Sequence, residues 1–255
     1  MKNLRTTLLL TLLGSIIILF GCKKTWPKVD FVPSEIVVKY KITLAHDTIK
    51  EIATYHNAEL YSTKQYFFYD SVDEIIYKNG NGITTRKTIL QIGSNGYAQS
   101  SVDSSFNDNG NFSGISASTF EYQDGFLTKY IIDTGRIICT YALANENFES
   151  SNVAYINWPS GCTDYYSYSS SLTTIDVINF KNKIFGKPSR NLREHAGWQN
   201  GCPCGPSSNP ASSDFTYEFN DNGWVTKIQE YYTPCYHSDT KNLTGTINTI
   251  LIEYY

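Results

Sequence analysis

Alternation of aromatic or aliphatic residues with polar ones dominates most of this chain. The segments that show it most clearly are residues 35–44, 87–92, 131–141, 153–158, 228–232 and 247–255. Successive side chains of a strand point to opposite faces, so this pattern predicts strands with one apolar face and one polar face. Antiparallel sheets with a single buried face have this pattern. We therefore expect an all-β protein, built as an antiparallel meander of hairpins.

A repeated turn of Asn or Asp followed by Gly marks the clearest hairpins. The copies cover residues 106–112, 120–130 and 217–228, with a degenerate copy at 66–77. Hairpin loops of this kind often contain a residue with positive φ, a conformation that costs Gly nothing sterically. Gly110, Gly125 and Gly223 are expected to adopt it. The repeats leave it undecided whether the meander stays an open sheet, splits into two layers or curls into a partial or closed barrel.

One segment has helical instead of alternating spacing. Its apolar residues run from Leu172 through Ile178 to Phe185, and Gly186 and Pro188 follow as stop signals. This spacing predicts one short accessory helix.

The first 21 residues have the form of an export signal. Lys2 and Arg5 precede an apolar stretch over residues 8–20, which is too short to span a bilayer as a helix. Gly21 stands directly before Cys22, and the whole arrangement resembles the bacterial lipobox. The resemblance implies that Cys22 becomes the acylated first residue of the mature protein, carrying chains such as palmitate.

This reading divides the chain into a signal peptide at residues 1–21, a lipidated tether at 22–34 and a single β-rich domain at 35–255. The lipid bilayer is then a partner through acylated Cys22. Lys23 follows the cysteine, where an Asp would signal retention in the inner membrane. We expect a cell-envelope protein anchored in the outer membrane and facing the periplasm.

Composition supports a β-rich exported protein and excludes one class of partner. The chain has 20 Tyr and 13 Phe but a single Met, a bias typical of strands. Its 21 basic residues face 24 acidic ones, and removal of the signal peptide takes away two of the basic residues. Nucleic acid is not an expected partner, because its binding requires basic surface.

Five cysteines remain once Cys22 is acylated: Cys139, Cys162, Cys202, Cys204 and Cys235. In an oxidising compartment such residues are expected to form disulfides that staple the region between residues 160 and 235. An odd number leaves one thiol unpaired. A single residue separates Cys202 from Cys204, whereas redox and zinc pairs use two, so neither a metal nor another cofactor is expected.

Two features of the chain carry a family resemblance. The hairpins at residues 120–130 and 217–228, together with the Phe-Gly-Lys-Pro-Ser-Arg-Asn-Leu string at 185–192, resemble a family of uncharacterised lipoproteins common in Bacteroidota-type bacteria. The hairpin unit is more loosely similar to the tyrosine-aspartate repeats of bacterial shell and toxin-encapsulating proteins. The resemblance covers residues 35–255 and implies no catalytic residue.

Known catalytic motifs do not occur in the chain. Its four histidines have no zinc-protease spacing, and neither a Gly-x-Ser-x-Gly elbow nor a phosphate-binding loop is present. His195, with Glu194 and Asp214, is an acid and base set on paper, but such residues are more often solvated surface groups. We therefore expect a protein that is not an enzyme.

Three functional hypotheses remain, in this order. The first is an envelope scaffold or protein-binding module that docks another envelope protein. The second is a glycan-binding outer-membrane lipoprotein, in which exposed aromatic residues stack against a polysaccharide. Its candidate ligand-facing residues are Trp158, Tyr165, Tyr166 and Trp198. The third is a hydrolase with its site in the loops between residues 160 and 215.

Overall fold

The computed structural model describes residues 27–45, 48–132, 136–143, 153–157, 163–172, 191–199, 208–237 and 239–255. Every regular element in these ranges is a β-strand. The strands are β1 (Lys28–Ala45), β2 (Thr48–His56), β3 (Glu59–Phe68), β4 (Val72–Asn79), β5 (Thr84–Ile92), β6 (Ala98–Phe106), β7 (Phe112–Gln123), β8 (Phe126–Ile132), β9 (Arg136–Leu143), β10 (Val153–Asn157), β11 (Thr163–Leu172), β12 (Asn191–Gln199), β13 (Ser208–Asn209), β14 (Ser212–Phe219), β15 (Val225–Thr233), β16 (Tyr236–His237) and β17 (Asn242–Tyr254).

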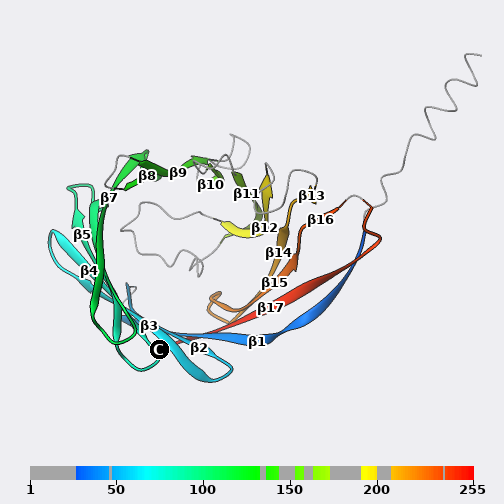
Figure 1. Ribbon diagram of the computed structural model, residues 1–255, viewed down its shortest axis with the longest axis horizontal. Helices are drawn as coiled ribbons and strands as arrows, with labels where there is room; N and C mark the ends of the chain where they lie inside the picture. The colour runs from blue at the N-terminus through cyan, green and yellow to red at the C-terminus, as the bar shows by residue number, and fades with distance from the viewer. Residues whose placement is uncertain are drawn as a thin grey trace, which may run out of the picture.

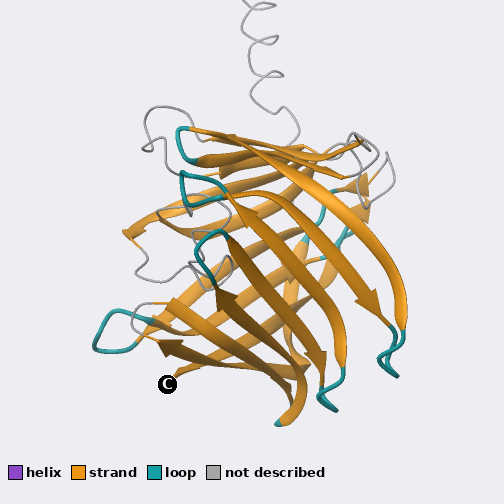
Figure 2. Ribbon diagram, turned by 90° about the vertical axis from the view of Figure 1, so that its left-hand side faces the viewer, coloured by secondary structure: helices purple, strands orange, loops and turns teal. Residues whose placement is uncertain are grey.

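Fifteen of the strands form one sheet whose order of pairing returns to its start, as in a closed barrel (Figure 1). β13 and β16 form a separate two-stranded sheet. Neighbours in the large sheet are antiparallel apart from β1 and β17, which are parallel. The expected all-β antiparallel meander is confirmed. Figure 2 shows the strands running obliquely between the two rims, where the turns gather.

The two ends of the chain make the pairing that joins the meander into a ring. Residues 28–33 pair with 242–247, and after an irregularity residues 37–42 pair with 249–254. Pro33 is the last paired residue before this irregularity, and proline is found in sheets mainly at edges and bulges because it has no N–H to donate. β1 thus begins inside the segment expected to be a tether, because Lys28–Pro33 has a partner strand at the far end of the sequence.

The predicted hairpins are present, with positive φ at each expected glycine. Gly110, Gly125 and Gly223 have φ of 80°, 86° and 76°. Gly82 and Gly96 occupy equivalent turns, each with φ of 78°. The sequence analysis missed these two copies, because their flanking strands are less aromatic.

A single asparagine organises the last of these turns. The Asn220 side-chain oxygen accepts hydrogen bonds from the backbone N–H groups of Asn222 at 3.1 Å and Trp224 at 2.9 Å. The Gly223 N–H donates to the Asn220 carbonyl at 2.9 Å. The turns that begin at Asn79 and Asn107 contain the same side-chain bonds. An Asn at the first position therefore satisfies turn N–H groups that the ladder leaves unpaired.

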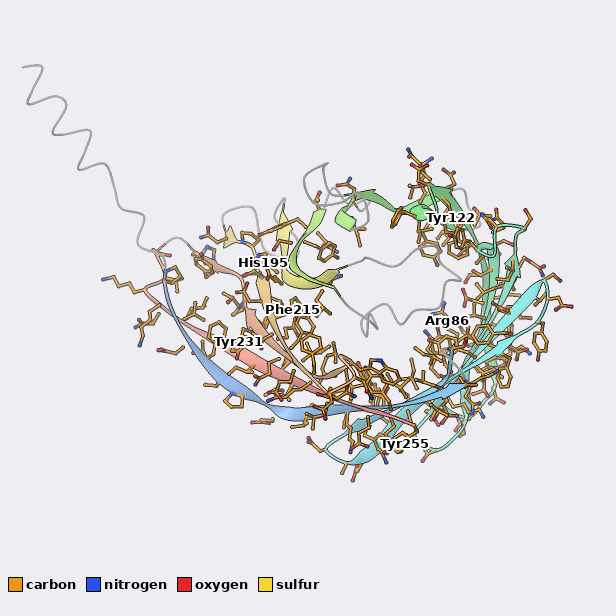
Figure 3. The ribbon with its side chains drawn as sticks, turned by 180° about the vertical axis from the view of Figure 1, so that it is seen from behind. Arg86, Tyr122, His195, Phe215, Tyr231 and Tyr255 are labelled. Atoms are coloured by element: carbon orange, nitrogen blue, oxygen red, sulfur yellow. The ribbon has the colours of Figure 1, made fainter. Side chains whose placement is uncertain are left out.

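The two faces of the sheet differ as the alternation predicts. Ile42 and Leu90 are fully buried, Ile228 and Val225 are 1% exposed, and all belong to one apolar cluster. Phe215 packs against this cluster and lies on the inner side of the ring in Figure 3. The core therefore lines the inner face of the sheet.

The outer face carries paired charges. Four Lys–Glu ion pairs join neighbouring strands there, at nitrogen–oxygen distances of 3.0 Å or less: Lys39–Glu253, Lys87–Glu74, Lys129–Glu121 and Lys227–Glu218. Each pair is at least partly exposed, so each contributes little to stability. Together the pairs show that this face is charged and exposed.

Two expectations differ from the described structure or lie outside it. The strand expected over residues 131–141 is two strands, since β8 ends at Ile132 and β9 begins at Arg136; the Asp-Thr-Gly sequence between them has turn composition. Leu172, where the accessory helix was expected to begin, is the last residue of β11. The rest of that predicted helix lies outside the described residues.

Substitution of Gly223 by Val should destabilise the fold by at least about 1 kcal/mol. Nothing lies within 4 Å of a Cβ added there, so the cost comes from forcing a β-branched residue to a φ of +76°. Gly114→Val in β7 is the matched control, since it too has open space but an ordinary strand conformation. Urea unfolding measures both; equal stability of Gly223→Val and the parent would contradict the turn assignment.

Candidate functional site

A pocket of about 350 Å³ lies where several strands end near the start of β1. We call it the rim pocket. Its wall is made by Pro27, Val29, Tyr165, His195, Asn209, Pro210, Ser212, Thr233 and Tyr236. These residues come from β1, β11, β12, β14 and β15 and from the two-stranded sheet, apart from Pro27, which precedes β1, and Pro210, which follows β13. The pocket therefore exists only because the ends of the chain meet beside the middle strands.

Tyr165 is held against the backbone of the neighbouring strand. It pairs with Gly197 across β11 and β12, and a Cβ at Gly197 would lie 2.3 Å from the Tyr165 ring. Only glycine therefore leaves room for the ring in this position. Cross-strand pairs of glycine and an aromatic residue are a known device of β-sheets. The close contact fixes the ring in the pocket wall.

His195 and Asp214 form a hydrogen-bonded pair beside this ring. They are register partners on β12 and β14, with 2.7 Å between Nδ1 and Oδ1. The His195 and Tyr165 ring centroids are 5.6 Å apart. Asp214 precedes the inward-facing Phe215, so the pair lies on the outer face of the sheet. The carboxylate fixes the imidazole orientation and leaves Nε2 for another partner.

The pocket gathers some of the residues that the sequence singled out and not others. Tyr165 and His195 line it, and Asp214 orients His195. Tyr166 does not line it; the Arg193 guanidinium carbon lies 4.0 Å from the Tyr166 ring centroid. Trp198 belongs to β12, but its side chain is outside the described residues, as is the whole of Trp158.

Tyr236 is a pocket residue that sequence analysis missed. It lies in the two-residue strand β16, whose pairing with Asn209 places both residues at the pocket. So short a strand has no periodicity to detect. The nearby Cys235 was the available signal that this segment is structured.

Cys235 is the one cysteine whose side chain is described, and it is disulfide-bonded. Its partner lies outside the described side chains. Cys139 is in β9, without a described side chain, and Cys22, Cys162, Cys202 and Cys204 fall outside the described residues. The expected pairing of the five cysteines and the free thiol stay predictions.

A second group of side chains, here called the inner cluster, lies on the inner face of β3 to β6: Lys64, Tyr66, Tyr77, Arg86 and Asp103. Lys64, Tyr77 and Arg86 are register partners across β3, β4 and β5 and so share one face. Lys64 is also the partner of the core residue Ile52. That pairing places the row on the apolar side of the sheet.

Asp103 holds the arginine of this cluster. Arg86 Nε and Nη2 each lie 2.7 Å from Asp103 Oδ1, which also accepts a hydrogen bond from the Thr88 hydroxyl. The Asp103 side chain is 8% exposed, whereas that of Arg86 is 46% exposed. Arg86 points to the inner side in Figure 3, so water reaches the inner cluster.

Lys64 has no hydrogen-bonding or ion-pair partner among the described residues. Its ammonium lies 5.0 Å and 5.1 Å from the ring centroids of Tyr66 and Tyr77. Burial, helped by the positive charge of Arg86, lowers the pKa of Lys64 to about 8. The cation–π contacts therefore compensate only part of the lost hydration.

The chain matches no protein-family model and no curated protein. Among solved structures it is similar to a porin-like protein from Bacteroides uniformis ATCC 8492, with a TM-score of 0.51 and 13% sequence identity. The match covers 80% of this chain and 85% of that chain. At this identity the likeness shows a shared β fold.

No helix in the described ranges has the length and apolar character required to cross a membrane. No group of His, Cys, Asp and Glu side chains in those ranges is arranged to hold a metal ion.

Raising the pH from about 7 to about 9.5 should stabilise the fold through Lys64. Its pKa is about 8 when folded and 10.5 when unfolded, so the unfolded state binds more protons in this window. The free energy of unfolding then rises with pH, by about 2 kcal/mol. Urea unfolding at the two pH values measures this. Lys64→Met should remove the rise and Lys41→Met, on the outer face, should keep it; an unchanged rise in Lys64→Met would contradict the assignment.

Proposed function

We propose that this protein is a lipid-anchored envelope protein that binds a saccharide in the rim pocket. The observation that carries the proposal is the pocket wall itself. Tyr165 and Tyr236 offer aromatic surface, while Ser212 and Thr233 offer hydroxyl groups. Sugars present C–H faces that pack on aromatic rings and hydroxyls that need hydrogen-bonding partners, and few polar groups suffice to orient a ligand in such a pocket.

The position of the pocket agrees with a lipid anchor at Cys22. Pro27 lines the pocket and is five residues beyond Cys22 in the sequence. Five extended residues span at most about 18 Å. Acylation of Cys22 would therefore hold the pocket close to the bilayer surface, within reach of membrane-linked glycans.

The charged outer face of the sheet supports the proposal that the domain lies in the aqueous phase beside the bilayer. Its Lys–Glu pairs lie on β1, β4, β5, β7, β8, β14, β15 and β17, and so on both sides of the junction between β1 and β17. A charged side chain among lipid tails costs about 2–4 kcal/mol near the middle of the bilayer. The lipid on Cys22 then supplies the attachment to the outer membrane, and the likeness to a porin-like protein is compatible with an envelope location.

Binding explains the rim pocket better than hydrolysis does. His195 and Asp214 form a base and its orienting group, and Ser212 lines the same pocket. In the described structure, however, Ser212 makes no hydrogen bond to His195, which an activated nucleophile requires. We therefore propose that the protein is not an enzyme and that His195 contacts the ligand through Nε2.

Protein binding is a second candidate function, favoured by an apolar strip on the outer face. Ile89, Val102 and Ile115 are 36%, 39% and 68% exposed. Ile89 and Val102 are register partners on β5 and β6, and Ile115 lies diagonally on β7. Each strand of the ring already has two neighbours, so an envelope partner would dock on these side chains and not by strand addition.

Loss of either pocket tyrosine should weaken saccharide binding about tenfold, equivalent to about 1.4 kcal/mol. Affinity electrophoresis of the detergent-solubilised full chain against a panel of polysaccharides measures it for Tyr165→Ala and Tyr236→Ala. Tyr61→Ala is the matched control, because Tyr61 is 60% exposed on β3 and does not line the pocket. Two outcomes would overturn the saccharide proposal: undiminished binding of the same glycan by Tyr165→Ala, and no binding of any glycan by the parent chain. Either outcome would leave the apolar strip as the favoured surface.

Cys22→Ser should release the protein from the membrane fraction. Cells fed an alkyne-labelled palmitate should label the parent chain and not this variant, because the thiol is the point of attachment. Cys235→Ser is the control and should keep its label. Label on Cys22→Ser would refute the anchor, while cleavage of the parent chain by protease added to intact cells would refute the periplasmic orientation.

A further inference from the structure

We propose that the inner cluster is a second binding site, which takes the carboxylate of an acidic saccharide between Lys64, Arg86 and the hydroxyl of Tyr77. This site shares no residue with the rim pocket and lies on the opposite face of the sheet. The proposal goes beyond the function proposed above and does not depend on it.

The backbone places two cations on either side of one aromatic ring. Tyr77 is on β4, and Lys64 and Arg86 are its register partners on β3 and β5, the two strands that flank β4. The backbones of Lys64 and Arg86 are therefore about 10 Å apart. The Lys64 ammonium lies 5.1 Å from the Tyr77 ring centroid and the Arg86 guanidinium carbon lies 5.3 Å from it. We expect an anionic group bound between these cations, beside the Tyr77 ring and not over its electron-rich face, to contact both.

The cluster has an unbalanced positive charge. Asp103 engages Arg86 through Nε and Nη2 and leaves the Nη1 edge without an acceptor among the described residues. Lys64 has no carboxylate partner there at all. A half-buried cation is costly unless an opposite charge or hydrogen bonds compensate it, and a ligand carboxylate would supply both.

Nothing about packing alone requires a lysine at this position. The aliphatic side chain of Met is of similar length and could also cover Tyr66 and Tyr77, its neighbours on the same face of β3 and β4. The charge is therefore retained at a cost in stability. Costs of this kind are typical of residues that bind ligands.

Hydroxyl groups near the cations favour a sugar acid over a bare inorganic anion. The Tyr130 hydroxyl accepts a hydrogen bond from Ser118 at 3.2 Å, and Tyr130 is one of the groups that raise the pKa of Arg86. Tyr130 also stacks on Phe120, with centroids 5.5 Å apart. Phenol hydroxyls can donate to sugar oxygens, and aromatic faces can cover sugar C–H groups.

Calorimetric titration of the detergent-solubilised full chain tests the proposal with three probes: glucuronate, glucose and inorganic phosphate. We expect glucuronate to bind about tenfold more tightly than either other probe, a difference of about 1.4 kcal/mol. Lys64→Met should abolish this preference and Lys64→Arg should retain it. Lys41→Met is the matched control, since Lys41 also lies over two tyrosine rings, those of Tyr55 at 5.0 Å and Tyr255 at 6.0 Å, but on the outer face.

Three results would overturn this site. They are equal affinity for glucuronate and glucose, equal affinity for glucuronate and phosphate, and an undiminished preference in Lys64→Met with an unchanged far-UV spectrum. Tyr165→Ala separates the two proposals, because it should leave the glucuronate preference intact even if the rim pocket binds no saccharide.

Discussion

The parallel pairing of β1 with β17 is the contact on which the rest of this structure depends. Most other neighbours in the sheet are joined by local connections, whereas this pair joins the two ends of the chain. Contacts between distant segments form at a high entropic cost, so favourable interactions must compensate that cost. Two features supply such interactions here. One is the two runs of paired residues, and the other is the Phe31 ring, which lies so close over Gly245 that a Cβ there would be 2.6 Å from it.

Several consequences follow from this one pairing. It gives β1 and β17 a second neighbour each, so neither is left as an edge that invites aggregation. It also brings Pro27 and Val29 beside Thr233 and Tyr236, which completes the rim pocket. A segment that reads as a tether in isolation is thereby part of the domain, and the site of acylation lies close to the candidate binding site.

The curvature of the sheet separates two chemical environments that alternate along every strand. Ion pairs such as Lys87–Glu74 lie outside, where water screens them. Lys64 and Arg86 lie inside among aromatic rings, where the carboxylate of Asp103 pairs with Arg86 and Lys64 has no ion-pair partner among the described residues. Elsewhere on the inner wall both oxygens of a carboxylate are engaged: Glu230, on β15, accepts hydrogen bonds from Ser213 at 2.6 Å and Asn248 at 3.1 Å. Among the described residues of the two regions compared, charge is left without a partner in the inner cluster.

The hairpins were predictable from sequence because they are local. The Asn-x-Asn-Gly turns at Gly110 and Gly223 carry their own hydrogen bonds, and Asp-Gly marks the turn at Gly125, so all three glycines could be placed in advance. Closure of the ring, the pairing of His195 with Asp214 and the role of Tyr236 depend on segments far apart in sequence, which no local pattern relates. Lys64 lay within reach of sequence analysis, since it falls on the same face as Tyr66 and Phe68. Only the tertiary structure shows that this face turns inward and which side chains surround the lysine there, because its neighbours Tyr77 and Arg86 come from other strands whose register no local pattern fixes.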